Sequence, residues 1–190
     1  MNVYDFDNTI YDGESSISFF LFYICRHPAF LNALPVVLRA LCEYKKGGMS
    51  AEDILKRYAP LIEGYFTRIK GDPVKEIEKF WDSHMRKIKP FYYSLQKDDD
   101  LVLSALPEQS LKVVCERLNI KHYIGTVIDM KTGRIEKLCF HSRKPERFFE
   151  KFPDAVIENF YTDSEIYDGP LIEAAKRAFL VKKNMVVQIK

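Results

Sequence analysis

The fold of this chain is decided by residues 2–15, which read NVYDFDNTIYDGES. The segment NVYDF is typical of a short buried strand, although aspartate is depleted in strands. Asp5 and Asp7 stand at the end of this strand, and Thr9 follows them. Paired carboxylates at the end of a buried strand need a compensating positive charge, which a bound metal ion would supply. This stretch is therefore the first indication of a site that carries chemistry.

Length and composition are those of an ordinary globular protein. The 190 residues suit one domain, or a compact core with an inserted subdomain, and contents of 47% apolar and 29% charged residues argue against extensive disorder. A net charge of +2 gives no long-range attraction to nucleic acid, so no nucleic-acid partner is expected. Four cysteines lie far apart: Cys25, Cys42, Cys115 and Cys139. They fit reduced thiols better than a disulfide framework.

Neither a secretory signal nor a membrane-spanning helix is expected. Only four residues precede Asp5, which is too short for a signal peptide. The most membrane-like stretch, residues 17–42, is interrupted by charged residues and a proline: Arg26, His27, Pro28 and Arg39. We therefore expect a cytoplasmic protein.

Residues 15–90 are predicted to be wholly helical. Apolar side chains recur at helical spacing within three stretches: 30–41, 54–65 and 74–88. Helix starts are indicated by Pro28, by a capping box from Ser50 to Asp53 and by Asp72 before Pro73. Residues 45–50, KKGGMS, predict a break, and Pro35 is expected to kink the helix that contains it.

From about residue 98 the pattern alternates between strand and helix. Strands are predicted at 100–106, 122–128, 155–164 and 179–183. Helices are predicted at 107–119, with Pro107 in the first turn, at 144–152 and at 170–178, and residues 129–140 resemble a hairpin. Such alternation favours a parallel sheet with helices on both faces, where binding groups gather at the carboxyl ends of the strands.

Polar side chains stand at these strand ends. They are Asp5 and Asp7 after the first strand, Ser104 after the second, Asp163 and Ser164 after the fourth, and Lys144 at a helix start. Together they suit phosphoryl transfer, because one carboxylate can attack phosphorus while a second handles the proton of the leaving group. A divalent cation, usually Mg²⁺, would be held by aspartate oxygens, and a hydroxyl and an ammonium would bind the phosphoryl oxygens.

Four segments in this order, DFDNT, LVLSA, HSRKPERF and YTDSEIYDGPLI, resemble the motifs of the haloacid dehalogenase-like (HAD) superfamily. The TGR…C…K run before Lys144 and the pattern after Asp168 resemble its phosphoserine phosphatase-like branch. This resemblance implies an α/β fold: a Rossmann-like, doubly wound parallel sheet at residues 1–14 and 91–190. An all-helical C1 cap would occupy residues 15–90.

The resemblance also implies roles for individual residues. Asp5 would be the nucleophile that becomes a phosphoaspartate, and Asp7 would act as general acid and then as general base. Ser104 and Thr9 would bind phosphate, and Lys144 would neutralise the charge on Asp5 and the phosphoryl group. Lys137 and Arg143 are nearby alternatives to this lysine.

The implied metal site holds Mg²⁺ between Asp5, the backbone carbonyl of Asp7, and Asp163. Asp168 would support the site by orienting Lys144, or it could simply cap the following helix. The chain departs from the family pattern in two places relevant here. Asn8 replaces the usual glycine, and Leu106 stands where this branch often has a small hydroxyl residue.

The expected substrate is a small phosphate monoester such as phosphoserine, with Glu14 as a possible specificity residue. A cap arginine would then meet the substrate carboxylate, and four candidates remain open: Arg26, Arg39, Arg57 and Arg68. Residues 15–25 are apolar on nearly every side and could form a lid, a dimer surface or a peripheral membrane contact. Three alternatives stay open: a phosphatase for lipid phosphates such as phosphatidylglycerophosphate, a phosphomutase, and a non-catalytic interaction protein.

Overall fold

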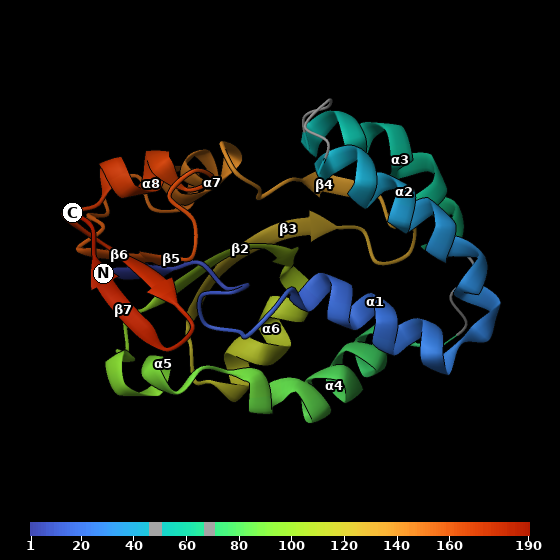
Figure 1. The fold of residues 1–190 in the computed structure, drawn as a ribbon, viewed down its shortest axis with the longest axis horizontal. Helices are drawn as coiled ribbons and strands as arrows, with labels where there is room; N and C mark the ends of the chain where they lie inside the picture. The colour runs from blue at the N-terminus through green and yellow to red at the C-terminus, as the bar shows by residue number, and fades with distance from the viewer. Residues whose placement is uncertain (46–50, 67–70) are drawn as a thin grey trace.

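A seven-stranded, mostly parallel sheet forms the centre of the protein in a computed structural model that describes residues 1–45, 51–66 and 71–190 (Figure 1). The strand order is β4-β3-β2-β1-β5-β6-β7, with antiparallel pairing only at the two edges. The strands are β1 (Asn2–Tyr4), β2 (Leu101–Pro107), β3 (His122–Ile128), β4 (Ile135–Lys137), β5 (Asn159–Thr162), β6 (Arg177–Lys182) and β7 (Met185–Gln188). The α/β architecture predicted from the sequence is confirmed.

The chain between β1 and β2 is helical in the described residues, and later helices alternate with strands (Figure 1). The first group is α1 (Ser15–Arg26), the 3-10 helix η1 (Pro28–Ala33), α2 (Leu34–Lys45), α3 (Ala51–Phe66), α4 (Pro73–His84), the 3-10 helix η2 (Met85–Lys87) and α5 (Pro90–Leu95). The second group is α6 (Glu108–Arg117), α7 (Arg143–Lys151) and α8 (Gly169–Ala174). Within the described residues, no helix combines the length and apolar character needed to cross a bilayer.

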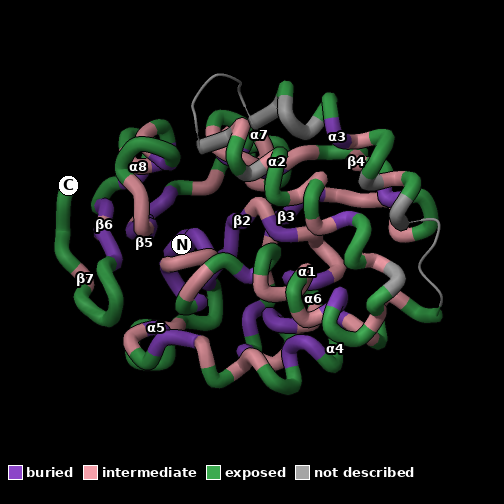
Figure 2. The backbone as a smooth tube through the Cα atoms, turned by 45° about the vertical axis from the view of Figure 1, so that its right-hand side comes forward, coloured by how far each residue is buried: buried purple, intermediate pink, exposed green. Residues whose placement is uncertain are grey.

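Helices cover both faces of the sheet, and each face has its own apolar core. On one face, α4 and α6 contribute Trp81 and Leu111 to a cluster that includes Tyr4. On the other face, α7 and α8 contribute Phe148 and Leu171. The central strands are buried along most of their length (Figure 2), which explains their near-continuous apolar sequences.

Several local predictions need correction. Pro35 does not kink a helix, because it is the second residue of α2, where its missing N–H costs nothing, and η1 precedes it. Pro107 ends β2 instead of lying inside the first turn of α6. Helix α8 stops at Ala174, well short of residue 178, because β6 begins at Arg177 and pairs with β5 there. Strand β7 and helix α5 were not predicted.

The predicted break at 45–50 and the Ser50 end of the capping box fall largely outside the described residues, as does Arg68. The other predicted cap is confirmed, since the Val74 N–H donates to the Asp72 carboxylate at 2.9 Å. The division into a core and a cap at residues 15 and 90 stays a prediction. Helix α4 packs closely on α6, where Trp81 Nε1 donates to Ser110 Oγ at 3.0 Å.

Candidate active site

The carboxyl ends of β1 and β5 and the start of α7 bring three charged side chains into contact. Lys144 Nζ donates to Asp5 Oδ1 at 2.7 Å and to Asp168 Oδ1 at 2.9 Å. All three residues are buried, at 6%, 7% and 2% exposure. Asp5 and Lys144 are 139 residues apart in sequence, so this contact exists only because the sheet assembles as it does. Three buried charges in direct contact are the centre of the candidate site.

Their electrostatics follow from this arrangement. Burial lowers the pKa of Lys144, but the adjacent Asp5 and Asp168 outweigh it and raise the pKa, so the ammonium stays protonated. Burial raises the pKa of Asp5, and Lys144 opposes that effect. The ammonium therefore offsets part of the negative charge that the sheet places in this buried position.

Asp7 lies at the N-terminus of α1. The backbone N–H of Ser15, the first residue of this helix, donates to Asp7 Oδ1 at 3.0 Å. Burial raises the pKa of Asp7 to about 6, against the opposing effect of the hydrogen bonds from Ser15. A carboxyl group with a pKa near neutrality can both give and take a proton, which suits a general acid and base.

Two hydroxyl groups predicted to bind phosphate are also buried here. Thr9 Oγ1 donates to Asp5 Oδ2 at 3.3 Å, so in this structure it holds the carboxylate. Ser104 lies within β2, next to β1, and its Oγ accepts the Leu106 N–H at 3.2 Å. This bond leaves the Ser104 proton available to a phosphoryl oxygen.

Asp168 does not cap α8 through its side chain. It is the residue before the helix, but its two carboxylate oxygens are held elsewhere, one by Lys144 and one by Thr162 Oγ1 at 2.6 Å. Thr162 was not singled out in the sequence, although it stands directly before Asp163 at the end of β5. The structure therefore shows Asp168 in contact with both Lys144 and Thr162, and its supporting role stays a prediction.

The donor set fits a hard divalent cation. Burial raises the pKa of Asp163, and nearby Asp168 and Glu14 add to this effect, which indicates an excess of negative charge. Within the part of the chain that the structure describes, no three His, Cys, Asp or Glu side chains converge on one point. The predicted metal site uses only two carboxylates, Asp5 and Asp163, plus the Asp7 carbonyl, and it stays a prediction. Carboxylate and carbonyl oxygens are the ligands that Mg²⁺ prefers.

A protein-family model described as haloacid dehalogenase-like hydrolase matches residues 3–173. The chain belongs to this family. No curated protein matches the sequence. The family typically uses Mg²⁺, in agreement with the oxygen donors described above.

Solved structures of low sequence identity share the fold of this haloacid dehalogenase-like hydrolase. A protein of unknown function from Bordetella pertussis is 20% identical with a TM-score of 0.74, over 94% of this chain and 87% of its own. A phosphoserine phosphohydrolase-like protein from Francisella tularensis is 16% identical with a TM-score of 0.66, over 97% and 89%. Phosphoserine phosphatase from T. onnurineus is 20% identical with a TM-score of 0.52, over 94% and 81%.

One buried cation of this hydrolase was missed in the sequence. Lys89 is 6% exposed, and its Nζ donates to the backbone carbonyl of Asn8, in the loop that carries Asp7. Burial lowers its pKa, while Asp12 and Asp163 raise it. Asn8 has φ of +57°, the unusual backbone angle that asparagine tolerates in place of glycine. A lone lysine between helices carried no signal that could have identified it.

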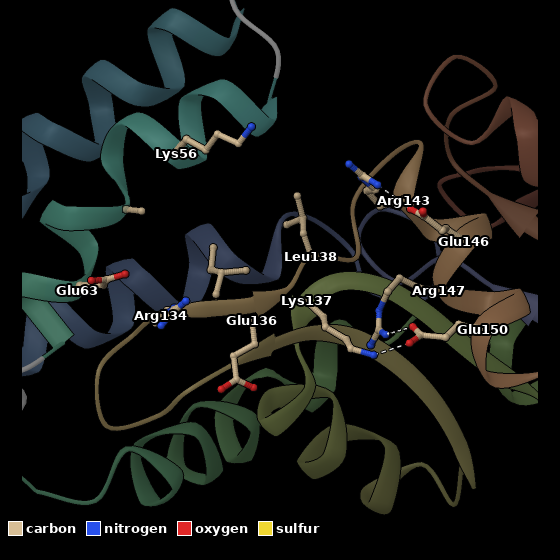
Figure 3. Close-up of a pocket in the computed structure, with 12 residues that line it drawn as sticks. Lys56, Glu63, Arg134, Glu136, Lys137, Leu138, Arg143, Glu146, Arg147 and Glu150 are labelled. Atoms are coloured by element: carbon tan, nitrogen blue, oxygen red, sulfur yellow. Dashed lines mark hydrogen bonds and ion pairs between the residues drawn. The ribbon is translucent and has the colours of Figure 1, made fainter.

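The two alternatives to Lys144 form ion pairs outside the buried group formed by Asp5, Lys144 and Asp168. Lys137 Nζ contacts the Glu150 carboxylate, and Arg143 pairs with Glu146 at 2.9 Å (Figure 3). These side chains line a cleft of about 630 Å³ between α3 and the β4–α7 region, whose lining contains none of the buried charged groups described above. Its walls carry both signs of charge in exposed or half-exposed ion pairs, which have small energies in water.

The specificity residues proposed from the sequence occupy different places. Glu14 is exposed and accepts a hydrogen bond from Asn8 Nδ2 at 2.7 Å. Arg26 lies over the Phe22 ring, 3.9 Å from the Glu76 carboxylate. Two more of the candidate arginines pair with Glu43: Arg39 at 3.2 Å and Arg57 at 3.3 Å.

Proposed function

We propose that this hydrolase is a Mg²⁺-dependent phosphomonoester phosphatase that works through a phosphoaspartate on Asp5. The observation that carries the proposal is the buried contact between Lys144, Asp5 and Asp168. An ammonium held beside a carboxylate reduces the repulsion that this nucleophile would otherwise exert on an incoming phosphate dianion. Mg²⁺ bound by Asp5, Asp163 and the Asp7 carbonyl would neutralise further phosphoryl charge.

The first half-reaction transfers the phosphoryl group to the protein. A carboxylate oxygen of Asp5 forms a bond to phosphorus while the bond from phosphorus to the ester oxygen breaks. Asp7, in its protonated form, donates its proton to that oxygen, and the product leaves as a neutral alcohol. The Ser104 hydroxyl and the Lys144 ammonium bind the phosphoryl oxygens, while Asp168 and Thr162 keep the ammonium in place.

The second half-reaction regenerates the carboxylate. Asp7, now ionised, accepts a proton from a water molecule as the water oxygen attacks phosphorus. The bond from phosphorus to the Asp5 oxygen breaks, and inorganic phosphate leaves. A raised pKa for Asp7 supports both roles, since the same group must be protonated in one step and ionised in the next.

The substrate expected from the sequence is a small monoester such as phosphoserine. A second candidate, a phosphate with an apolar leaving group, is favoured by a cavity of about 270 Å³ between the helical segment and the sheet, whose lining atoms are almost all carbon. A diacyl lipid phosphate, the alternative expected from the sequence, needs more room than this cavity offers. A phosphomutase would use the same residues but retain the phosphoryl group on Asp5. A non-catalytic interaction protein would turn over nothing.

Phosphate release from a panel of phosphomonoesters with Mg²⁺ tests the proposal. Asp5→Asn should abolish release, and Asp12→Asn, a change to an exposed carboxylate of the same loop, is the matched control. Chelation of the metal should stop turnover, and added Mg²⁺ should restore it. Stable labelling of Asp5 without phosphate release would favour the mutase. Release that survives in Asp5→Asn would refute the assignment of the nucleophile.

A further inference from the structure

The apolar cavity of about 270 Å³ lies between the helices that follow β1 and the ends of β2 and β3. Aromatic side chains of α1 and η1 form one wall, among them Phe19, Phe20 and Phe30. Leu106, Ile128 and Met130 form the opposite wall on the sheet side. The cavity therefore has one wall from the helical segment and one from the sheet.

Two residues of the lining lie close in the chain to residues that the proposed mechanism uses. Ser16 follows Ser15, whose N–H binds the proposed acid Asp7. Leu106 donates its own N–H to Ser104, the proposed phosphate ligand. Both contacts tie the lining of the cavity, within two residues along the chain, to the proposed acid and the proposed phosphate ligand, and this is the basis for assigning the non-phosphate part of a substrate to the cavity.

The lining lacks the charges that an amino acid substrate would need. Among the described residues it contains no lysine or arginine, and its one acid, Glu76, directs a carboxylate oxygen to Lys79 Nζ at 2.6 Å. The three described candidate arginines, Arg26, Arg39 and Arg57, are paired with Glu76 or Glu43 instead. A carboxylate placed in this cavity would lose its hydration without gaining a cationic partner from the lining.

Volume limits the size of the occupant. A cavity of roughly 150 Å³ takes up benzene, and pockets for drug-sized ligands begin at about 300 Å³. At about 270 Å³ this cavity accommodates one ring with a short linker, and it is too small for the two chains of a diacyl lipid.

From these observations we infer that the cavity binds the apolar leaving group of a phosphomonoester, a single aromatic ring joined to the ester oxygen by a short linker. This inference rests on the proposed phosphatase function for its connection to turnover. It assigns Leu106, which departs from the phosphoserine phosphatase pattern, to the wall that contacts the ring.

The test compares esters whose leaving alcohols have similar reactivity. Phosphate release is measured with Mg²⁺ for 2-phenylethyl phosphate, ethyl phosphate, phosphoserine and a short-chain diacyl phosphatidic acid. We expect kcat/KM for 2-phenylethyl phosphate to exceed that for ethyl phosphate roughly 10- to 100-fold, the effect of burying one aromatic side chain. Preference for phosphoserine or for the diacyl lipid would overturn the inference.

Cavity-filling variants locate the effect. Ala33→Phe places a ring into the cavity from η1 and should remove the advantage of 2-phenylethyl over ethyl phosphate. Leu31→Phe adds the same ring to the exposed side of η1, outside the lining, and should leave both rates unchanged. Val37→Phe fills the cavity from α2 and serves if Ala33→Phe does not fold. An advantage that survives in the filled variants would overturn the inference.

Binding of 2-phenylethanol, measured by calorimetry with ethanol as control, separates this inference from the proposed function. Binding to the native protein that is lost in the filled variant, without phosphate release from any ester, would refute the phosphatase and support the cavity assignment. Equal hydrolysis of both alkyl phosphates without binding of 2-phenylethanol would support the phosphatase and overturn the cavity assignment.

Discussion

Replacing Asp7 by asparagine should stabilise the metal-free protein at neutral pH while removing its turnover. The side-chain amide keeps an oxygen that can accept the Ser15 N–H, now 3.0 Å from Asp7 Oδ1, so the N-terminus of α1 stays capped. What the substitution removes is a carboxylate that burial holds in an unfavourable ionised state. The acid required by the leaving alcohol is lost with it, which should lower kcat by about 100-fold or more.

The magnitude follows from the pKa. Burial raises the pKa of Asp7 from 3.8 to about 6, and each pH unit corresponds to ~1.4 kcal/mol, so ionised Asp7 costs about 3 kcal/mol of unfolding free energy above pH 6. Between the two pKa values the folded state binds more protons than the unfolded state, and stability therefore falls as pH rises through this window. The advantage of Asp7→Asn should be small near pH 4 and complete at pH 7.5.

Urea unfolding of the metal-chelated proteins at pH 4.5 and pH 7.5 checks this expectation. Asp98→Asn, which removes an exposed carboxylate, is the control and should change the free energy of unfolding by less than about 0.5 kcal/mol at both pH values. If Asp7→Asn is no more stable than the native protein at pH 7.5, or gains equally at both pH values, the account of Asp7 as a carboxylate raised in pKa by burial is refuted.

Three further substitutions probe the site and its scaffold. Lys144→Ala should lower kcat for phosphate release about 100-fold or more, whereas Lys137→Ala should leave it unchanged; the reverse order would assign the cation to Lys137. Lys89→Met removes the donor to the Asn8 carbonyl and should lower kcat roughly 10-fold, while an unchanged kcat would make this contact purely structural. Gly125→Ala places a Cβ 2.5 Å from a backbone carbonyl of β2 and should cost about 1–3 kcal/mol in urea unfolding; a neutral result would show that β2 can move there.

The central strands could be predicted because local sequence determines them. Strands buried on both faces must be apolar throughout, and segments such as LVLSAL show this directly. Strand β7 differs, since three of its four residues are exposed to solvent and the fourth is only partly buried. Its pairing with β6 depends on the turn at residues 183–184. A short exposed edge strand leaves little hydrophobic pattern to detect.

The helix boundaries show where local rules compete. Pro35 was expected inside a helix because apolar residues recur at helical spacing on both sides of it. In the structure the same residues are divided between η1 and α2, and the proline takes the position at a helix start where it is tolerated. Likewise, the sequence predicts a helix at residues 170–178, but residues 177 and 178 belong to β6, which pairs with β5. Tertiary pairing decides such cases.

The charged side chains of the candidate site could be predicted from the sequence, but the residues that hydrogen-bond to them or to their loop could not. Asp5, Lys144 and Asp168 stand at strand ends or helix starts in a parallel sheet, where topology alone brings such side chains together. Thr162 and Lys89 lack this signal, because a threonine inside a strand and a lysine after a 3-10 helix are usually structural or solvated. Their relevance appears only when their polar atoms are found buried against Asp168 and Asn8.

The loop that carries Asp7 is tied to both ends of the helical segment. At the entry, the first N–H of α1 holds Asp7. At the exit, Lys89 holds the Asn8 carbonyl through its side chain and the Ile10 carbonyl through its backbone N–H at 2.8 Å. An antiparallel β-bridge between Tyr11 and Ile88 directly joins the segment that enters the helical region to the segment that leaves it. The helices cannot rotate over the sheet without straining contacts that position the acid. In the proposed phosphatase, any movement of the helices over the sheet would therefore also move Asp7.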